Sequence, residues 1–320
     1  MKPIFVIHEN EEWFPPLKAA LETVGLEYRE LHMGAAKVDL SGSPEDGIYY
    51  NRMSASSWTR AHAAAPQLTL ALLEQLELHG RRVVNGSRAL DLEISKARQC
   101  AAMARAGIRF PRSFLAVGKD DILAAARSLN GPIILKPDCG GKGAGVQLFA
   151  SIDELANRLR NNPALPPAEE LMPVQAYIEP AEPFIIRNEF VGGEHLYSVR
   201  VDTSDGFELC PADVCEIGDG VRSLVAPVNK FEVLTDFNHP NLDPYKELLR
   251  NEGIEIAGIE MITDGQGQAW TYDININTNY NGKAEEDRGI AGTEKAGMMA
   301  IADFLGHLAG QRLPSRIAAE

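Results

Sequence analysis

The stretch Pro132-Ile-Ile-Leu-Lys-Pro-Asp-Cys-Gly-Gly-Lys-Gly-Ala-Gly-Val-Gln-Leu-Phe149 decides the fold. It predicts a short apolar strand that carries Lys136, then a loop, then a second strand that runs to Phe149. The loop holds Gly140, Gly141, Gly143 and Gly145. Because glycine has no Cβ, the backbone N–H groups of this loop can come close to a bound group. With a lysine beside them they suit an anion, above all a triphosphate.

The spacing of this stretch excludes two common phosphate-binding motifs. A P-loop needs a Gly-Lys-Ser/Thr triplet that opens a helix, and a dinucleotide-binding fingerprint needs its three glycines at fixed spacing between a strand and a helix. Neither arrangement occurs in this stretch. It therefore predicts a glycine-rich hairpin that lies over the phosphates of a nucleotide in a different fold.

Length and composition indicate an ordinary globular protein. The chain has 320 residues, of which 45% are hydrophobic, and can therefore bury a sizeable core divided into two or three lobes. Its formal net charge of −14 argues against a nucleic-acid partner, because neutralising phosphates needs clustered Lys and Arg. A solvated acidic surface accounts for this charge.

Cysteine spacing and hydropathy favour a cytoplasmic protein. Cys100, Cys139, Cys210 and Cys215 show no Cys-x-x-Cys pair, which favours reduced thiols over disulfides or a zinc site. No apolar run is long enough to span a membrane. Residues 1–7 lead straight into a strand and do not resemble a signal peptide.

The first part of the chain predicts a parallel sheet. An apolar strand at residues 3–7, a helix near 16–24 and a strand at 26–31 form a β-α-β unit. Ligands of such sheets bind beyond the carboxyl ends of the strands, which makes the turn residues His8, Glu9 and Asn10 candidates for a substrate cleft. A solvated turn is the alternative.

A third strand of this sheet ends in Asn51 and Arg52. An arginine in this place can bind a carboxylate through two parallel hydrogen bonds, so we expect both residues to contact substrate. A surface ion pair of Arg52 is the alternative. Further on we expect a helix over 66–79, a strand over 81–84, and a helix over 93–107 with Lys96 near its beginning.

Two features divide the rest of the chain. Ser151 and Glu154 form a capping box for a helix that runs to about residue 161, and residues 162–167 are rich in proline and predict a linker. Beyond it, a strand begins at Val174, residues 184–191 and 195–201 predict an antiparallel hairpin, and a final helix covers roughly 293–308. We place unit boundaries near residues 90 and 170.

A candidate metal site lies on another predicted strand pair, residues 258–262 and 269–277. Glu260 and Asp273 stand on either side of its turn, and Asn275 is on the same face as Asp273. Three oxygen donors on adjacent strands can hold a divalent cation, and magnesium is preferred when phosphate oxygens complete its shell. Ordinary strand-edge polar residues are the alternative, although the run Asp-x-Asn-x-Asn-x-Asn is costly in a strand unless something binds it.

Together these features resemble the ATP-grasp superfamily, and within it the ribosomal-protein glutamate ligase and alpha-L-glutamate ligase branch. The resemblance covers most of the chain. It implies an α/β fold in which two lobes clasp ATP behind an N-terminal parallel-sheet domain. Residues 1–90 would form this N-terminal substrate domain, 91–170 the small lobe with the glycine-rich loop, and 171–320 the C-terminal lobe with the metal site.

The resemblance also implies roles for individual residues. Lys96 and Lys136 would contact the phosphates of ATP, with Gly141, Lys142 and Gly143 in the loop that closes over them. Gln175, Ala176, Tyr177 and Ile178 would read adenine through the backbone, and Glu179 would bind the ribose. Glu260, Asp273 and Asn275 would hold two magnesium ions, with Mn²⁺ as a substitute.

Three further positions follow from the same resemblance. Arg187 is similar to an arginine near the γ-phosphate that the family precedes with an aspartate, although Ile185 stands here in that place. Arg200 and Arg52 resemble positions that stabilise an acylphosphate and a substrate carboxylate. Asn277 and Asn279 resemble an asparagine extension in some glutamate-ligase-like proteins, and we expect Asn277 to contact substrate.

The implied reaction joins a carboxylate to an amine at the expense of ATP, through an acylphosphate. Small-molecule carboxylate and amine substrates are expected, an amino acid among them, with a peptide or protein tail as a further option and a homo-oligomer as the assembly. Three alternatives keep the fold: a kinase, a carboxylate–thiol ligase, and a nucleotide-binding regulatory protein without turnover.

Overall fold

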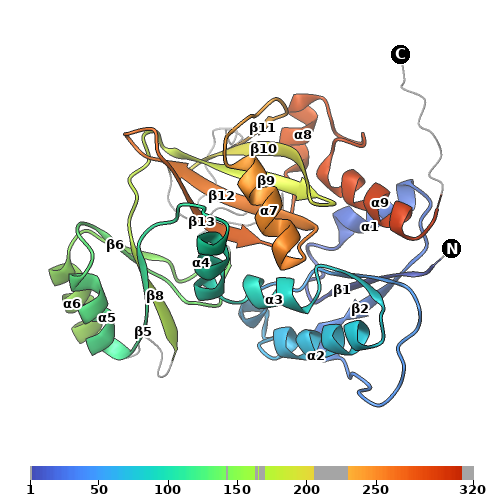
Figure 1. The fold of residues 1–320 in the computed structure, drawn as a ribbon, viewed down its shortest axis with the longest axis horizontal. Coiled ribbons are helices and arrows are strands. Elements are labelled where there is room, and N and C mark those ends of the chain that lie inside the picture. The colour runs from blue at the N-terminus through green and yellow to red at the C-terminus, as the bar shows by residue number, and fades with distance from the viewer. Residues whose placement is uncertain (1, 142, 163–164, 166–169, 205–229, 312–320) are drawn as a thin grey trace, which may run out of the picture.

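The computed structural model describes residues 2–141, 143–162, 165, 170–204 and 230–311. Lys142, Cys210, Cys215 and most of the predicted linker at 162–167 lie outside the described residues. Cys100 and Cys139 are free thiols. Three β-sheets with flanking helices make up the described part of the chain (Figure 1).

The first sheet is parallel and has the strand order β2-β1-β3-β4. Its strands are β1 (Ile4–His8), β2 (Tyr28–His32), β3 (Ile48–Asn51) and β4 (Arg82–Val84). Helix α1 (Pro15–Thr23) packs on one face, and α2 (Ala65–Leu78) and α3 (Ser87–Glu93) pack on the other. Two single-turn helices, η1 (Met33–Ala35) and η2 (Ser57–Arg60), follow β2 and β3. The predicted β-α-β unit is confirmed.

The second sheet is antiparallel and has the order β5-β8-β6-β7. Its strands are β5 (Ser113–Val117), β6 (Ile133–Leu135), β7 (Gln147–Phe149) and β8 (Leu171–Ala176). Helices α5 (Gly118–Arg127) and α6 (Ile152–Asn161) cover one face and bury an apolar core of their own. Strands β6 and β7 form the predicted glycine-rich hairpin, and the hydroxyl of Ser151 caps α6 by accepting from the N–H of Glu154.

The third sheet is antiparallel and has the order β11-β10-β9-β12-β13. Its strands are β9 (Phe184–Val191), β10 (Glu194–Asp202), β11 (Phe231–Leu234), β12 (Ile256–Thr263) and β13 (Ala269–Asn275). The helices beside it are α4 (Lys96–Arg105), α7 (Leu242–Glu252), α8 (Gly282–Arg288) and α9 (Gly297–Leu308). Within the described ranges, none of the helices combines the length and apolarity that crossing a bilayer requires.

Two expectations from the sequence are corrected. The helix predicted over 93–107 is interrupted after Glu93, because Ser95 takes an extended backbone and caps α4, its hydroxyl accepting from the N–H of Arg98. The strand predicted from Val174 at the start of the third unit is β8, which pairs with β5 and β6 in the second sheet. The sequence of a strand does not show which neighbour it will pair with. The predicted boundary near 170 is therefore too early, because β8, which follows it, still belongs to the second sheet, here called the small lobe.

His8, at the end of β1, makes the stability of this sheet depend on pH. Its ring is buried against Phe14, with the ring centroids 4.4 Å apart. Burial, with Arg52 and His32 nearby, lowers the pKa of His8 from 6.5 to about 4. The unfolded chain therefore binds a proton on His8 at a higher pH than the folded chain does. Stability should fall as the pH drops from 6.5 toward 4, by about 2 kcal/mol from this group.

A phenylalanine at this position removes the titrating group and keeps an aromatic ring on Phe14. We expect His8→Phe to lose less melting temperature than the wild type between pH 7 and pH 4.5. Thermal denaturation of both proteins over this range measures the difference. Parallel curves for the two proteins would show that His8 is not the source of the pH dependence.

Candidate active site

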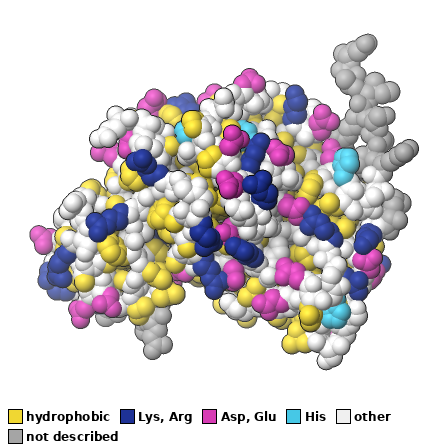
Figure 2. Space-filling view, in the orientation of Figure 1, with side chains coloured by type: hydrophobic (Ala, Val, Ile, Leu, Met, Phe, Trp, Pro, Cys, Tyr) yellow, Lys and Arg dark blue, Asp and Glu magenta, His cyan; other side chains and the backbone are white. Residues whose placement is uncertain are grey.

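A cavity of about 400 Å³ opens between the second and third sheets. The second sheet contributes Ile134, Lys136 and Gln175, and the third contributes Ile185, Arg187 and the paired strands β12 and β13. On the molecular face in Figure 2, Lys and Arg side chains are mixed with Asp and Glu, which is the pattern of a solvated surface. The cavity, by contrast, gathers its charged groups in a small buried volume.

Two lysines from different elements line the cavity. Lys136 follows β6 directly, and its Nζ donates to Gln175 Oε1 at 3.2 Å. Burial, together with the nearby Lys96, lowers the pKa of Lys136. Lys96 is the first residue of α4, and its Nζ forms an ion pair with Asp273. Burial opposes the charge of Lys96, but Asp273 raises its pKa. Since both lysines line the cavity, an anion bound there would lie near them.

Glu260 and Asp273 face each other across β12 and β13, as the sequence predicts. A β-bulge follows Glu260, because Met261 pairs with Thr271 and leaves Tyr272 as the extra residue of β13. The bulge allows the consecutive residues Tyr272 and Asp273 both to line the cavity. Burial would raise the pKa of Asp273, but Lys96 and Lys136 hold it below its usual range.

Arg187 is the centre of a buried ionic network. Its Nε donates to Glu189 at 2.6 Å, its Nη1 to Glu260 at 2.6 Å, and its Nη2 to Thr278 Oγ1 at 2.8 Å. Despite burial, the two carboxylates raise the pKa of the guanidinium, which stays charged. Gly258 leaves room for it, since a Cβ there would come within 2.4 Å of Nη2. Arg187 is therefore fixed in place at the cavity wall.

The donor set on β12 and β13 fits a magnesium ion. Glu260, Asp273 and Asn275 line the cavity, and their side-chain oxygens are ligands of the kind that Mg²⁺ prefers. Asn275 Nδ2 and Asn277 Oδ1 are buried and have no hydrogen-bond partner among the described residues. Nowhere in the described part of the chain do three His, Cys, Asp or Glu side chains form a cluster that could hold a metal by themselves. A cation here would therefore need amide and phosphate oxygens to complete its shell.

The glycine-rich loop forms one wall. Gly140, Gly141 and Gly143 line the cavity, and Gly143 and Gly145 have φ of +73° and +77°, where other residues would be strained. Lys142, between Gly141 and Gly143, lies outside the described residues. A Cβ on Gly141 would lie 3.5 Å from Cβ of Ser56, so this loop rests against the segment after β3.

The segment that leaves β8 forms the opposite, more apolar end. Gln175, Ala176, Tyr177 and Ile178 all line the cavity. Glu179 is exposed, and its side chain is not among the described residues that line the cavity. The apolar side chains of Ile185, Ile262 and Tyr272 also line the cavity.

Arg52 lies behind the far end of the cavity and is only 3% exposed. Its Nη1 donates to the carbonyl of Trp13 at 3.3 Å, and its Nη2 to Asn279 Oδ1 at 2.9 Å. Arg52 Nε has no partner in the described part of the chain. Since Trp13, Asn277 and Asn279 line the cavity, Arg52 holds this end in shape and keeps one donor free.

The structure does not bring Asn51 or Arg200 to the cavity. Both polar groups of Asn51 are used internally, because Nδ2 donates to Asn85 O and Oδ1 accepts from Met53 N. Arg200 pairs with Ile186 of β9, so its side chain lies on the sheet face opposite to Arg187. There it lies 4.2 Å from the ring centroid of Phe184 and is 44% exposed.

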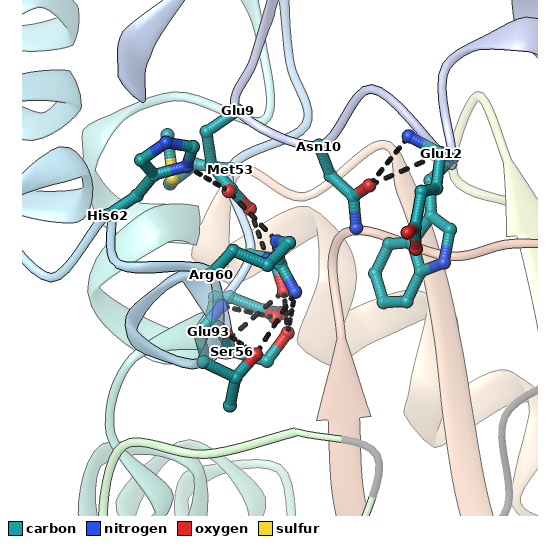
Figure 3. Close-up of polar contacts among 12 residues, drawn as sticks. Glu9, Asn10, Glu12, Met53, Ser56, Arg60, His62 and Glu93 are labelled. Carbon is teal, nitrogen blue, oxygen red and sulfur yellow. Dashed lines mark hydrogen bonds and ion pairs between the residues drawn. The ribbon is translucent and has the colours of Figure 1, made fainter. Parts of the chain in front are cut away.

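Figure 3 shows the turn after β1, where the sequence placed His8, Glu9 and Asn10 as candidates. The buried Glu9 carboxylate binds Arg60 and also His62, whose Nδ1 lies 3.0 Å away. Burial opposes its charge, but these partners lower the pKa of Glu9. Asn10 Oδ1 accepts from the N–H groups of Glu12 and Trp13. Glu9 is thus engaged in structural ion pairs.

Several cavity residues were not anticipated from the sequence. Ile185 and Ile262 stand two positions from Arg187 and Glu260, so the two-residue period of a strand could have placed them on the cavity face. Tyr272 depends on the bulge and Trp13 on a turn between elements. Neither of these has a signal in the sequence.

The sequence matches no protein-family model and no curated protein. Solved structures do match. A RimK-domain ATP-grasp protein from Sphaerobacter thermophilus DSM 20745 superimposes with a TM-score of 0.65 at 17% identity, over 95% of this chain and 99% of that one. D-cycloserine synthetase DcsG gives 0.62 at 16% identity, over 96% and 99% of the two chains.

A third match is the ATP-grasp ligase PsnB in complex with a minimal precursor. Its TM-score is 0.64 at 16% identity, over 95% of this chain and 99% of that one. The matches span nearly the whole of each chain, so the likeness extends across all three sheets. The protein therefore has the ATP-grasp fold, as the sequence predicts.

Proposed function

We propose that this protein is an ATP-dependent carboxylate–amine ligase that forms an amide or peptide bond through an acylphosphate. The observation that carries the proposal is the convergence of Lys96, Lys136, Arg187 and two facing carboxylates in one cavity of an ATP-grasp fold. These groups come from both sides of the cavity, so a nucleotide between them would be held by both lobes.

In this proposal the nucleotide lies along the cavity. The base occupies the apolar end, at the backbone of residues 175–178, and the triphosphate reaches the two lysines beneath the glycine-rich loop. Glu260, Asp273 and Asn275 hold magnesium, whose bound ions would neutralise charge on the phosphate oxygens. The proposed number of ions is two, with Mn²⁺ as a substitute. The ATP-grasp ligase PsnB has been solved with Mg and ADP.

The residues of this chain bind, orient and shield the reactants. An oxygen of the substrate carboxylate attacks the γ-phosphorus, the bond to the β-phosphate oxygen breaks, and ADP leaves. Lys136 and Arg187 stabilise the charge that spreads over the transferred oxygens. The glycine-rich loop excludes water until the amine attacks the acyl carbon and expels phosphate. The amine proton that is lost in this step passes to phosphate or solvent.

The substrate end of the cavity supports a carboxylate-bearing substrate such as an amino acid. Arg52 carries a buried charge whose described partners are backbone and amide oxygens, and Asn277 offers an unpartnered Oδ1. Arg52 lies behind the residues that line the cavity, so its charge would favour a substrate anion on their other side, and an ammonium or amide N–H near Asn277 would satisfy Oδ1 of that residue. The macrocyclase MdnC has been solved with a precursor peptide, so a peptide acceptor is part of the proposal. We also propose a cytoplasmic location and a homo-oligomer.

Lys136 gives a direct test of the nucleotide assignment. Lys136→Met is expected to weaken ATP binding about 10- to 100-fold, because a charge-assisted hydrogen bond to phosphate is worth about 1.5–3 kcal/mol. Calorimetric titration with a non-hydrolysable ATP analogue and magnesium measures it. Lys119→Met is the matched control, since Lys119 binds carbonyls at the end of α6. Equal affinities for both variants would remove Lys136 from the site.

The reaction itself is tested by ADP and phosphate release with ATP and magnesium, first alone and then with pairs of amino acids and small amines. Release that requires two added compounds is expected and would identify the substrates. Release with a single hydroxyl compound would indicate a kinase, and release with a carboxylate and a thiol a carboxylate–thiol ligase. ATP binding without release under any pair would favour a regulatory protein.

A further inference from the structure

Every carboxylate proposed as a metal ligand is already paired with a cation. Lys96 Nζ lies on Asp273 Oδ1, and Arg187 Nη1 lies 2.6 Å from Glu260 Oε1. Arg187 also binds Glu189, which is 1% exposed. The charged groups that line the cavity are three cations, Lys96, Lys136 and Arg187, and two carboxylates, Glu260 and Asp273. The buried carboxylates Glu189 and Glu93 lie just outside it, next to Arg187 and Lys96 respectively. Cations and carboxylates in this part of the structure are thus paired with one another.

This pairing opposes the binding of either ligand alone. A divalent cation by itself would bring two positive charges to carboxylates that already have cationic partners, and a bare triphosphate would bring several negative charges to cations that already have carboxylate partners. When both enter together their charges largely cancel. The chain therefore favours the pair of ligands over each separately.

The two cations paired with these carboxylates, Arg187 and Lys96, differ in how many side-chain partners hold them. Arg187 is fixed by three partners, Glu189, Glu260 and Thr278. Lys96, by contrast, has Asp273 as its one side-chain hydrogen-bond partner within the described residues. An ammonium on a flexible four-carbon stem can move to a neighbouring anion, which a guanidinium held in a fork cannot do. Lys96 lines the same cavity as the glycine-rich loop, so phosphate oxygens beneath that loop would lie within its reach.

We propose that Lys96 and a divalent metal compete for Asp273, so that nucleotide binding frees the metal site by drawing Lys96 onto phosphate. This inference rests on the proposed nucleotide site and adds a coupling to it. Binding of the two ligands is then cooperative in both directions, since a coupling free energy between two sites is reciprocal. Without nucleotide, Lys96 keeps metal off Asp273.

The experiment measures Mn²⁺ binding to the full chain without nucleotide, by the loss of the free Mn²⁺ signal in electron paramagnetic resonance. Lys96→Met is expected to bind Mn²⁺ about 10- to 100-fold more tightly than the wild type, within the usual range of coupling between sites. The same variant should bind ADP in the presence of EDTA more weakly. An opposite change in the two affinities is the signature of competition.

Lys136→Met is the matched control, because it removes the same charge from the same cavity without releasing Asp273 from its partner. It should gain clearly less Mn²⁺ affinity than Lys96→Met. Lys96→Gln, which keeps a donor for Asp273, should fall between Lys96→Met and the wild type and serves if Lys96→Met folds poorly. Equal Mn²⁺ affinities for Lys96→Met and the wild type, or equal gains for both lysine variants, would overturn the competition. Failure of the wild type to bind ADP with metal would instead overturn the proposed function.

Discussion

Asp273→Asn is expected to lower the rate of ADP release about a thousandfold while leaving the fold intact. The amide has the shape of the carboxylate but lacks its charge, and a metal ligand that neutralises a transferring phosphoryl group supplies several kcal/mol of stabilisation. The Asn carbonyl can still accept from Lys96, so the buried ion pair becomes a hydrogen bond rather than an unpaired charge. Turnover at saturating ATP and magnesium, with circular dichroism for the fold, measures both effects.

Asp264→Asn is the matched control for this variant. Asp264 lies in the turn between the same two strands, where its carboxylate accepts from the ring N–H of Trp270 and from nearby backbone. It should retain turnover close to that of the wild type. Normal activity of Asp273→Asn in magnesium would show that Asp273 is not a metal ligand.

Among the variants proposed for this protein, Arg187→Met is expected to lower the free energy of unfolding the most. The side chain neutralises Glu189 and Glu260, and its removal leaves two buried carboxylates without their cation. Breaking a buried ion pair in this way typically costs about 3–5 kcal/mol. Burial already raises the pKa of Glu189, and without Arg187 this carboxyl would take up a proton at a still higher pH. The melting temperature at pH 7.5 should therefore fall further than at pH 5.5.

Two further proteins make this prediction specific. Arg200→Met removes an exposed arginine from the neighbouring strand, and its surface pairs with Glu182 and Glu232 at 3.8 and 3.6 Å are worth less than about 1 kcal/mol. The triple variant Arg187→Met, Glu189→Gln, Glu260→Gln removes the buried charges together and should recover part of the lost stability. Equal losses for Arg187→Met and Arg200→Met would contradict the buried network.

The features that the sequence predicts well are local. The glycine-rich hairpin and the strand pair that carries Glu260 and Asp273 depend on turn residues and apolar periodicity within about 20 residues, and the structure confirms both. The resemblance to ATP-grasp proteins was built on the same local segments. The solved structures now confirm the fold.

What the sequence could not supply depends on register and on distant partners. The side on which Arg200 lies is fixed by its pairing with Ile186, which no local pattern reveals. Asn51 follows a strand just as Arg52 does, but its amide is consumed by Asn85, 34 residues away. The sequence indicates a phosphate contact for Lys96 but not its ion pair with Asp273, because that pair joins residues 177 positions apart.

The packing of α9 has a structural consequence. Its apolar residues share one core with α1 of the first sheet and with β9 and β10 of the third (Figure 1). The first and third sheets are therefore joined by a continuous apolar core. The core of the second sheet, in the described residues, draws only on positions 114–176. The small lobe therefore keeps an apolar core of its own, separate from the core that joins the other two sheets.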